Sequence, residues 1–138
     1  MKQLIGLIAL LLAACGAQTT GLKIDNATYR APLVDGVPGV AYFSITSTAN
    51  DRIVGISSPQ AQAVEIHGSS TEGGMATMQK LDQVELPAGK TVTFGPGGLH
   101  VMVFTPVPRP ANATFPIQIT LESGRTETIS FTDETAAK

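Results

Sequence analysis

Residues 67–102 read HGSSTEGGMATMQKLDQVELPAGKTVTFGPGGLHVM, and this stretch holds nearly all of the chain's candidate metal ligands. It contains both histidines of the protein and every methionine except the first, namely His67, His100, Met75, Met78 and Met102. Ten residues separate His67 from Met78, twenty-one separate Met78 from His100, and one separates His100 from Met102. Imidazole and thioether groups without a thiolate suit a soft ion such as Cu(I) better than Mg²⁺ or Ca²⁺, which prefer oxygen. The stretch therefore predicts a copper site.

The local pattern at the end of this stretch predicts a strand that presents two ligands on one face. The run LHVMVF, residues 99–104, is apolar and of strand length. Because successive side chains of a strand point to opposite faces, His100 and Met102 are expected to project together, with Val101 and Val103 on the other side.

A hairpin is expected to carry the other two ligands. The segments EIHGSS and MATMQK flank residues 71–74, TEGG, and glycine tolerates the positive φ that tight turns need. With the reversal centred between Glu72 and Gly73, residue i faces residue 145 minus i. This register predicts that His67 lies opposite Met78.

The rest of the chain favours an all-β domain. No window after the first residues shows apolar periodicity typical of a helix, whereas alternation is clear in segments such as residues 117–122. Many short strands separated by turn residues predict a β-sandwich or a small Greek-key barrel. The expected strands are KIDNATYR, GVAYFSITS, RIVGISS, QAVEIHG, MATMQKL, TVTF, LHVMVF, FPIQITLES and TETISFT.

The N-terminal residues predict export and lipidation. Residues 1–14, MKQLIGLIALLLAA, have one lysine and an apolar run of signal-peptide length, and LAAC at residues 12–15 looks like a bacterial lipobox. Cys15 would then carry the lipid, and residues 15–21 would form a tether. The alternative is an ordinary signal peptide with a buried or free cysteine. Without Lys2, eight basic residues face eleven acidic ones, and no basic run or aromatic platform suggests nucleic acid.

The spacing His, ten residues, Met, twenty-one residues, His, one residue, Met resembles the signature of the periplasmic copper chaperones of the PCu(A)C family. LPAGKTVTFGPGGLHVM at residues 86–102 and the segment at residues 28–68 are also similar to this family, so the resemblance covers roughly residues 22–131. It implies a cupredoxin-like fold and one Cu(I) ion held by His67, Met78, His100 and Met102. It also implies delivery to a copper-accepting protein during assembly of the Cu(A) centre of cytochrome c oxidase, either subunit II or another assembly chaperone.

This interpretation gives the chain four parts and a location. They are a signal peptide at 1–14, a lipidated tether at 15–21, a copper-chaperone β-domain at 22–132 and a short polar tail at 133–138. The mature protein is expected in the periplasm or cell envelope, anchored to a membrane by its lipid.

Several alternatives stay open. Ser69 stands where many family members have a further methionine, and the chain ends FTDETAAK without a His- and Met-rich tail, so a second copper site is in doubt. Met75 fits either an auxiliary ligand or an apolar lip over the site. Copper buffering or resistance in the envelope would need the same four ligands, and a non-metal lipoprotein interaction module needs none of them. Catalysis is not expected, because a hydrolytic zinc site favours three His or carboxylate ligands and only two histidines exist.

Overall fold

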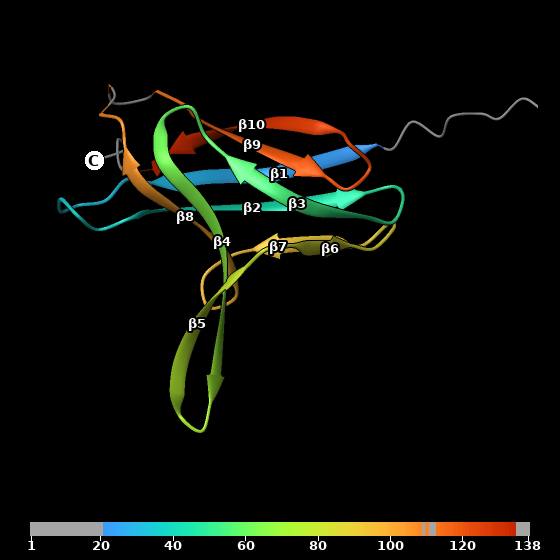
Figure 1. Cartoon of the computed structure of the whole chain (residues 1–138), viewed down its shortest axis with the longest axis horizontal. Coiled ribbons are helices and arrows are strands. Elements are labelled where there is room, and N and C mark those ends of the chain that lie inside the picture. The colour runs from blue at the N-terminus through green and yellow to red at the C-terminus, as the bar shows by residue number, and fades with distance from the viewer. Residues whose placement is uncertain (1–20, 109, 111–112, 135–138) are drawn as a thin grey trace, which may run out of the picture.

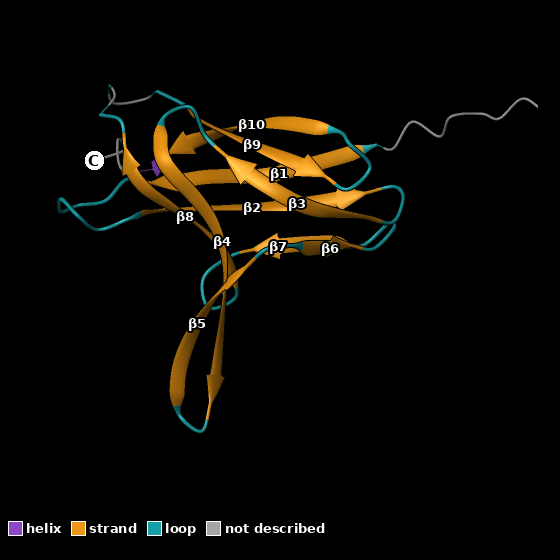
Figure 2. Cartoon of the chain, viewed as in Figure 1, coloured by secondary structure: helices purple, strands orange, loops and turns teal. Residues whose placement is uncertain are grey.

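The computed structural model describes residues 21–108, 110 and 113–134, which form ten β-strands and no α-helix; the short purple piece near the C-terminal end in Figure 2 is a 3₁₀ turn at Glu134. The strands are β1 (Leu22–Arg30), β2 (Gly39–Ser47), β3 (Asp51–Ser57), β4 (Ala61–Glu72), β5 (Met75–Leu81), β6 (Val84–Leu86), β7 (Thr91–Phe94), β8 (Leu99–Pro106), β9 (Phe115–Leu121) and β10 (Thr126–Asp133). The predicted signal peptide, Cys15 and most of the tether lie outside the described residues, as does most of the tail. Within the described part, no helix is long and apolar enough to cross a membrane.

Alternation of apolar and polar residues builds most of these strands, as predicted. In β2 and β9 every second side chain is fully buried, and in β9 these are Phe115, Ile117, Ile119 and Leu121. The nine predicted runs correspond to nine of the strands. The structure adds β6, a three-residue strand that pairs with β3.

The strands join into one continuous sheet with the order β5-β4-β8-β7-β2-β1-β10-β9-β3-β6. A parallel pairing of β1 with β10 connects the β5-to-β1 part to the β10-to-β6 part. The two parts lie over one another as layers (Figure 1), and β3 contacts β4 while β2 contacts β6. The all-β prediction is therefore confirmed.

Aromatic rings and branched aliphatic side chains fill the space between the layers. Phe43 stacks on Phe94 with ring centroids 4.3 Å apart and meets the edge of Phe131 at 5.7 Å. Tyr29 stacks on Phe115 at 4.5 Å. These contacts connect β2 with β7 and β10, and β1 with β9, and both β2 and β7 pair with β8.

The hairpin of β4 and β5 extends away from the layered body (Figure 1). All residues of β5 except Leu81 are exposed, whereas the first half of β4 packs on the core through Val64 and Ile66. β4 therefore links the core to a projecting ribbon, and His67 lies where the two parts meet.

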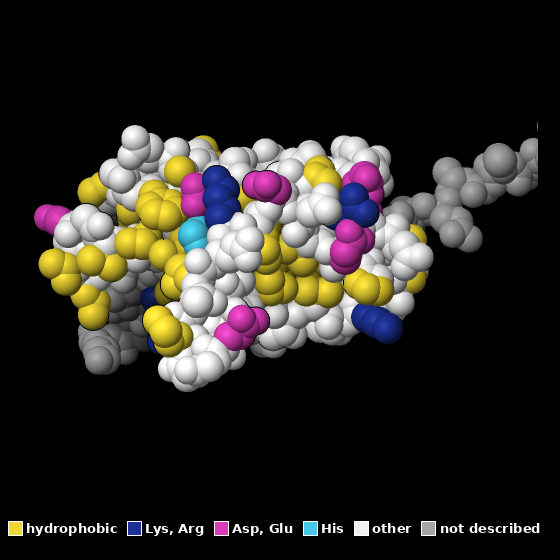
Figure 3. Space-filling model, turned by 60° about the horizontal axis from the view of Figure 1, so that its bottom comes forward, with side chains coloured by type: hydrophobic (Ala, Val, Ile, Leu, Met, Phe, Trp, Pro, Cys, Tyr) yellow, Lys and Arg dark blue, Asp and Glu magenta, His cyan; other side chains and the backbone are white. Residues whose placement is uncertain are grey.

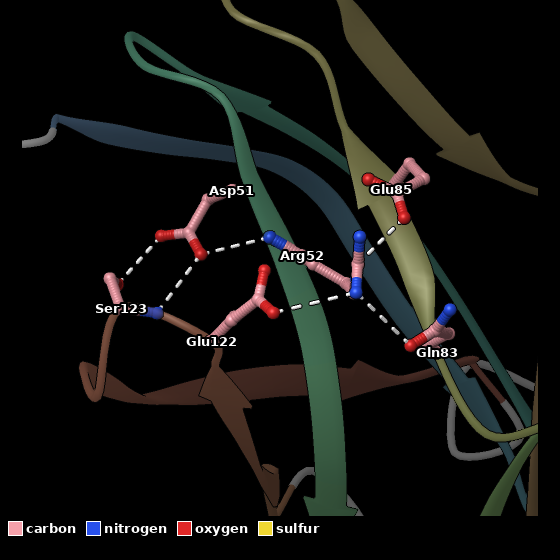
Figure 4. A network of polar contacts seen from close by, with 6 residues as sticks. All are labelled: Asp51, Arg52, Gln83, Glu85, Glu122 and Ser123. Atoms are coloured by element: carbon pink, nitrogen blue, oxygen red, sulfur yellow. Dashed lines mark hydrogen bonds and ion pairs between the residues drawn. The ribbon is translucent and has the colours of Figure 1, made fainter.

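At one end of the layers, a polar network clamps β3 against its neighbours (Figure 4). Asp51 accepts hydrogen bonds from the Ser123 hydroxyl at 2.7 Å and from the backbone N–H groups of Arg52 at 2.8 Å and Ser123 at 3.2 Å. The Arg52 guanidinium lies 2.6 Å from Glu85 and 3.4 Å from Glu122. The network thus ties β3 to β6 and to the turn after β9.

This network predicts an acid-sensitive contribution to stability. Partial burial raises the pKa of Asp51, but the hydrogen bonds from Ser123 and from the Arg52 backbone outweigh it and lower the pKa below 3.8. A carboxyl pKa lowered by folding stabilises the native state above the unfolded value, and this stabilisation is lost as the pH falls through the folded value. We expect Asp51→Asn to cost about 1 kcal/mol at pH 7 and less below pH 4. Thermal unfolding at several pH values measures this, with Asp35→Asn in the exposed β1–β2 loop as control; a pH-independent cost would contradict the assignment.

Candidate metal site

The candidate ligands lie on three neighbouring strands, because β8 pairs with β4 and β4 pairs with β5. Val101 and Val103 of β8 point into the core, as predicted, and are fully buried. His100 and Met102 therefore lie on the other face of the sheet. His67 of β4 sits directly opposite His100 on this face, with ring centroids 5.8 Å apart and ring planes inclined by 37°.

The ring of His100 is held by the turn that precedes its strand. Its Nδ1 lies 3.0 Å from the carbonyl oxygen of Gly98, and its side chain is almost fully buried, with 6% of the residue exposed. A carbonyl oxygen only accepts hydrogen bonds, so Nδ1 carries the proton. In the neutral ring the lone pair is then on Nε2. Gly97 has a φ of 78°, which glycine adopts without strain, so the Pro-Gly-Gly turn places the Gly98 carbonyl beside the imidazole.

The ring of His67 is held by side chains instead. Its Nε2 lies 2.9 Å from Oε2 of Glu65, and the other carboxylate oxygen of Glu65 accepts a bond from the Lys80 ammonium at 3.0 Å. The hydrogen bond with His67, followed by that from Lys80, lowers the pKa of Glu65, so Glu65 is ionised at neutral pH. Figure 3 shows a histidine side chain on this face with acidic and basic side chains next to it.

Nδ1 of His67 is buried and has no hydrogen-bond partner among the described residues. An ionised carboxylate only accepts, so Nε2 of His67 donates to Glu65, and in the neutral ring the unpartnered Nδ1 carries the lone pair. A buried acceptor without a partner is uncommon in proteins. Each imidazole therefore uses one nitrogen in a hydrogen bond, and the lone pair of its other nitrogen is available to a metal ion. This is the usual arrangement of a metal-binding histidine.

The two methionines lie at opposite ends of the histidine pair. Met102 is half-buried and follows His100 by one step along the same face of β8. Met78 of β5 pairs with Ser69, which places it diagonally to His67 on that same face, and 57% of it is exposed. One side of the site is thus covered by the sheet and the other is open to solvent.

The predicted register of the hairpin was wrong by two residues. His67 pairs with Lys80, not Met78, and residue i faces residue 147 minus i. The reason is the turn: Gly73 and Gly74 have φ values of 58° and 79°, so both glycines form the two-residue reversal and Glu72 stays in the strand. Because the side-chain period of a strand is two, this shift keeps Met78 on the face of His67.

This geometry separates Met75 from the four other candidate ligands. It lies three positions before Met78 and therefore on the opposite face of the hairpin, at its tip, with 71% exposed. A role for Met75 as auxiliary ligand stays a prediction. The spacing pattern does not include Glu65, which the sequence favours as a solvated strand residue rather than an oxygen ligand; it contacts His67 because residues i and i+2 share a face.

Comparison with known proteins gives both a family and curated relatives. Residues 22–132 match the family described as "Putative lipoprotein LpqE-like". The chain is 28% identical over 107 residues to "Putative lipoprotein Lxx21020" of Leifsonia xyli subsp. xyli, which covers 77% of this chain and 64% of the relative. It is 35% identical over 68 residues to "Uncharacterized protein RP573" of Rickettsia prowazekii, and this match covers 47% of this chain and 38% of the relative. The chain thus spans less than two thirds of the length of each relative.

Solved structures show the same fold. The copper-bound PCuAC domain from PmoF2 superposes with a TM-score of 0.67 at 25% identity, over 83% of this chain and 94% of that domain. The Cu(I) form of DR1885 from Deinococcus radiodurans superposes with a TM-score of 0.66 at 27% identity, over 86% of this chain and 82% of DR1885. These matches confirm the predicted cupredoxin-like β fold.

Proposed function

This chain belongs to the LpqE-like family, its likeness to PCuAC domains is confirmed, and on that premise we propose that it is a copper chaperone of the cell envelope. It binds one Cu(I) ion and passes it to a partner protein. The proposed ligands are two imidazoles and two thioethers, from His67, His100, Met78 and Met102. Copper in the PmoF2 domain and Cu(I) in DR1885 support the choice of metal.

The single observation that carries this proposal is the pair of facing imidazoles. His67 and His100 are 33 positions apart in the sequence, yet their ring centroids lie 5.8 Å apart and each ring keeps one nitrogen lone pair. A buried Nδ1 without a hydrogen-bond partner is expected where that nitrogen binds a metal ion. It is not expected in a histidine that only stabilises the fold. The flanking thioethers make the donor set soft, which suits Cu(I).

The donor set also suits a carrier. Four neutral ligands leave the charge of Cu(I) uncompensated, whereas a recipient with thiolates neutralises it, so transfer toward thiolates is favourable. Met78 is the most exposed of the four and is the ligand that an incoming partner can displace first. The histidines must be unprotonated to bind, so protons compete with Cu(I) for the two imidazoles.

The recipient and the location follow from the same proposal. We propose that the partner is a copper-accepting protein, with cytochrome c oxidase subunit II or another assembly chaperone as the first choice, and that lipidation of Cys15 anchors the protein in the envelope. The protein is proposed to have no catalytic activity of its own. A protein that only stores copper in the envelope would bind Cu(I) equally well but would not transfer it.

A competition titration tests the binding step. The full-length chain, kept in solution with a mild detergent, is titrated with Cu(I) against a chromophoric chelator, beside a His67→Ala, Met78→Ala double variant. We expect one equivalent bound by the parent and loss of competition in the variant. A parent that does not compete would leave a non-metal interaction module as the better account. Adding a dithiol acceptor peptide to the loaded protein then separates a carrier, which releases its copper, from a store, which retains it.

A further inference from the structure

Glu65 lies on β4, the strand that pairs with β8 on one side and with β5 of the hairpin on the other. It precedes His67 by two residues on the same face of β4 and lies opposite Met102 of β8. One of its carboxylate oxygens is 2.9 Å from Nε2 of His67 and the other is 3.0 Å from Nζ of Lys80. The side chains of Glu65 and His67 are 27% and 15% exposed, so solvent has limited access to the hydrogen bond between them.

We propose that Glu65, held by Lys80, is a positioning residue that fixes His67 as its Nε2–H tautomer and so presents Nδ1 to the metal. The assignment follows from the donors and acceptors. The carboxylate cannot donate, hence the proton resides on Nε2, and the nitrogen left with a lone pair is the buried Nδ1 that has no partner among the described residues. The metal part of this inference rests on the proposed function; the tautomer does not.

The consequence is an asymmetric pair of histidines. His100 donates from Nδ1 to the Gly98 carbonyl and offers Nε2, whereas His67 donates from Nε2 and offers Nδ1. Nδ1 lies nearer to its own backbone than Nε2 does. His67 therefore presents its metal-binding nitrogen close to the backbone of β4. A flip of the ring would replace Nδ1 with Nε2, which lies farther from that backbone. Glu65 opposes that rotation.

Lys80 gives the carboxylate a second fixed contact from a different strand. It lies directly opposite His67 in the β4–β5 pairing. The ion pair therefore couples the orientation of the His67 ring to the correct register of the projecting hairpin, which also carries Met78. A slip of the hairpin would release Glu65 and move Met78 at the same time.

Two readouts test this inference on the full-length chain in detergent micelles. Two-bond ¹H–¹⁵N correlation spectra of the metal-free protein at pH 8 report which ring nitrogen carries the proton. We expect a single Nε2–H form for His67 and the opposite, Nδ1–H, form for His100. In Glu65→Ala, His67 is expected to become a mixture of tautomers while His100, an internal control, does not change. An Nδ1–H form of His67 in the parent would overturn the inference.

The second readout is Cu(I) affinity. Glu65→Ala is expected to raise the Kd for Cu(I) by roughly 10- to 100-fold, and Glu65→Gln, whose amide oxygen can still accept from Nε2, is expected to restore part of it. The matched control is Glu127→Gln on β10, because Glu127 has a similar exposure and also pairs with a cation, Arg125, at 3.0 Å. Equal affinity in Glu65→Ala and the parent would refute the positioning role while leaving the copper site intact. If the parent binds no Cu(I), the proposed function fails, and the NMR spectra still decide the tautomer.

Discussion

Replacing His100 with alanine is expected to weaken Cu(I) binding by about 100-fold or more, since a histidine that binds the metal directly is worth at least as much as a group that orients one. His100 is almost fully buried and is already aligned by the Gly98 carbonyl, so little conformational freedom is lost when its Nε2 binds. The chain has only one other histidine, and that residue is itself a proposed ligand. No imidazole is therefore left to replace it.

The same titration with Met78→Leu gives the comparison that makes this prediction specific. Met78 is largely exposed and loses side-chain freedom when it binds, so we expect a smaller loss, roughly tenfold or about 1.4 kcal/mol. Gln79→Ala serves as control, because Gln79 neighbours Met78 on the opposite face of β5. Competition with the chelator measures all four proteins, and circular dichroism checks that each is folded. Parent-like affinity in His100→Ala would rule out this site.

Replacing Phe43 with alanine is expected to have the largest effect on folding, with a loss of about 3–5 kcal/mol in the free energy of unfolding. Phe43 is 2% exposed, stacks on Phe94 and contacts Phe131, so its removal leaves a cavity where β2, β7 and β10 meet. Total stabilities of about 5–15 kcal/mol are typical of small domains, so the loss is a large share.

Chemical denaturation measures this loss through the midpoint and slope of the unfolding curve. Val54→Ala on β3 is a suitable control, because Val54 is 42% exposed and its truncation is expected to cost less than 1 kcal/mol. A similarly small change in Phe43→Ala would mean that the aromatic contacts between the layers contribute little to stability.

Most strands of this protein could be predicted because one face of each is buried, although β5 is exposed along almost its whole length. From Ile117 to Leu121 in β9 the sequence alternates between isoleucine or leucine and polar residues, and the burial follows it position by position. Strand β6 was missed because its three residues, ahead of Pro87, are too few for alternation to appear. The parallel pairing of β1 with β10 was also not predictable, since it joins segments near the two ends of the described chain.

The four candidate ligands come from the sequence pattern and stay a prediction, and their geometry could be predicted only in part. That His100 and Met102 share a face follows from local alternation, whereas the alignment of His67 with His100 depends on the pairing of β4 with β8, which local patterns do not encode. The hairpin register was missed although a Gly-Gly pair indicates a two-residue turn. The hydrogen bond between Glu65 and His67 depends on side-chain conformations. Lys80 of β5 contributes to these through its own bond to Glu65, and local sequence patterns do not encode that contact.

Copper K-edge X-ray absorption on the loaded full-length chain identifies the atoms around the Cu(I) ion, which we propose is held by two imidazoles and two thioethers. We expect a shell of two nitrogen and two sulfur atoms around each copper in the parent. A Met78→Leu, Met102→Leu double variant is expected to lose the sulfur contribution and keep the nitrogen. A parent site without sulfur, or a sulfur contribution that survives both replacements, would rule out the proposed ligand set.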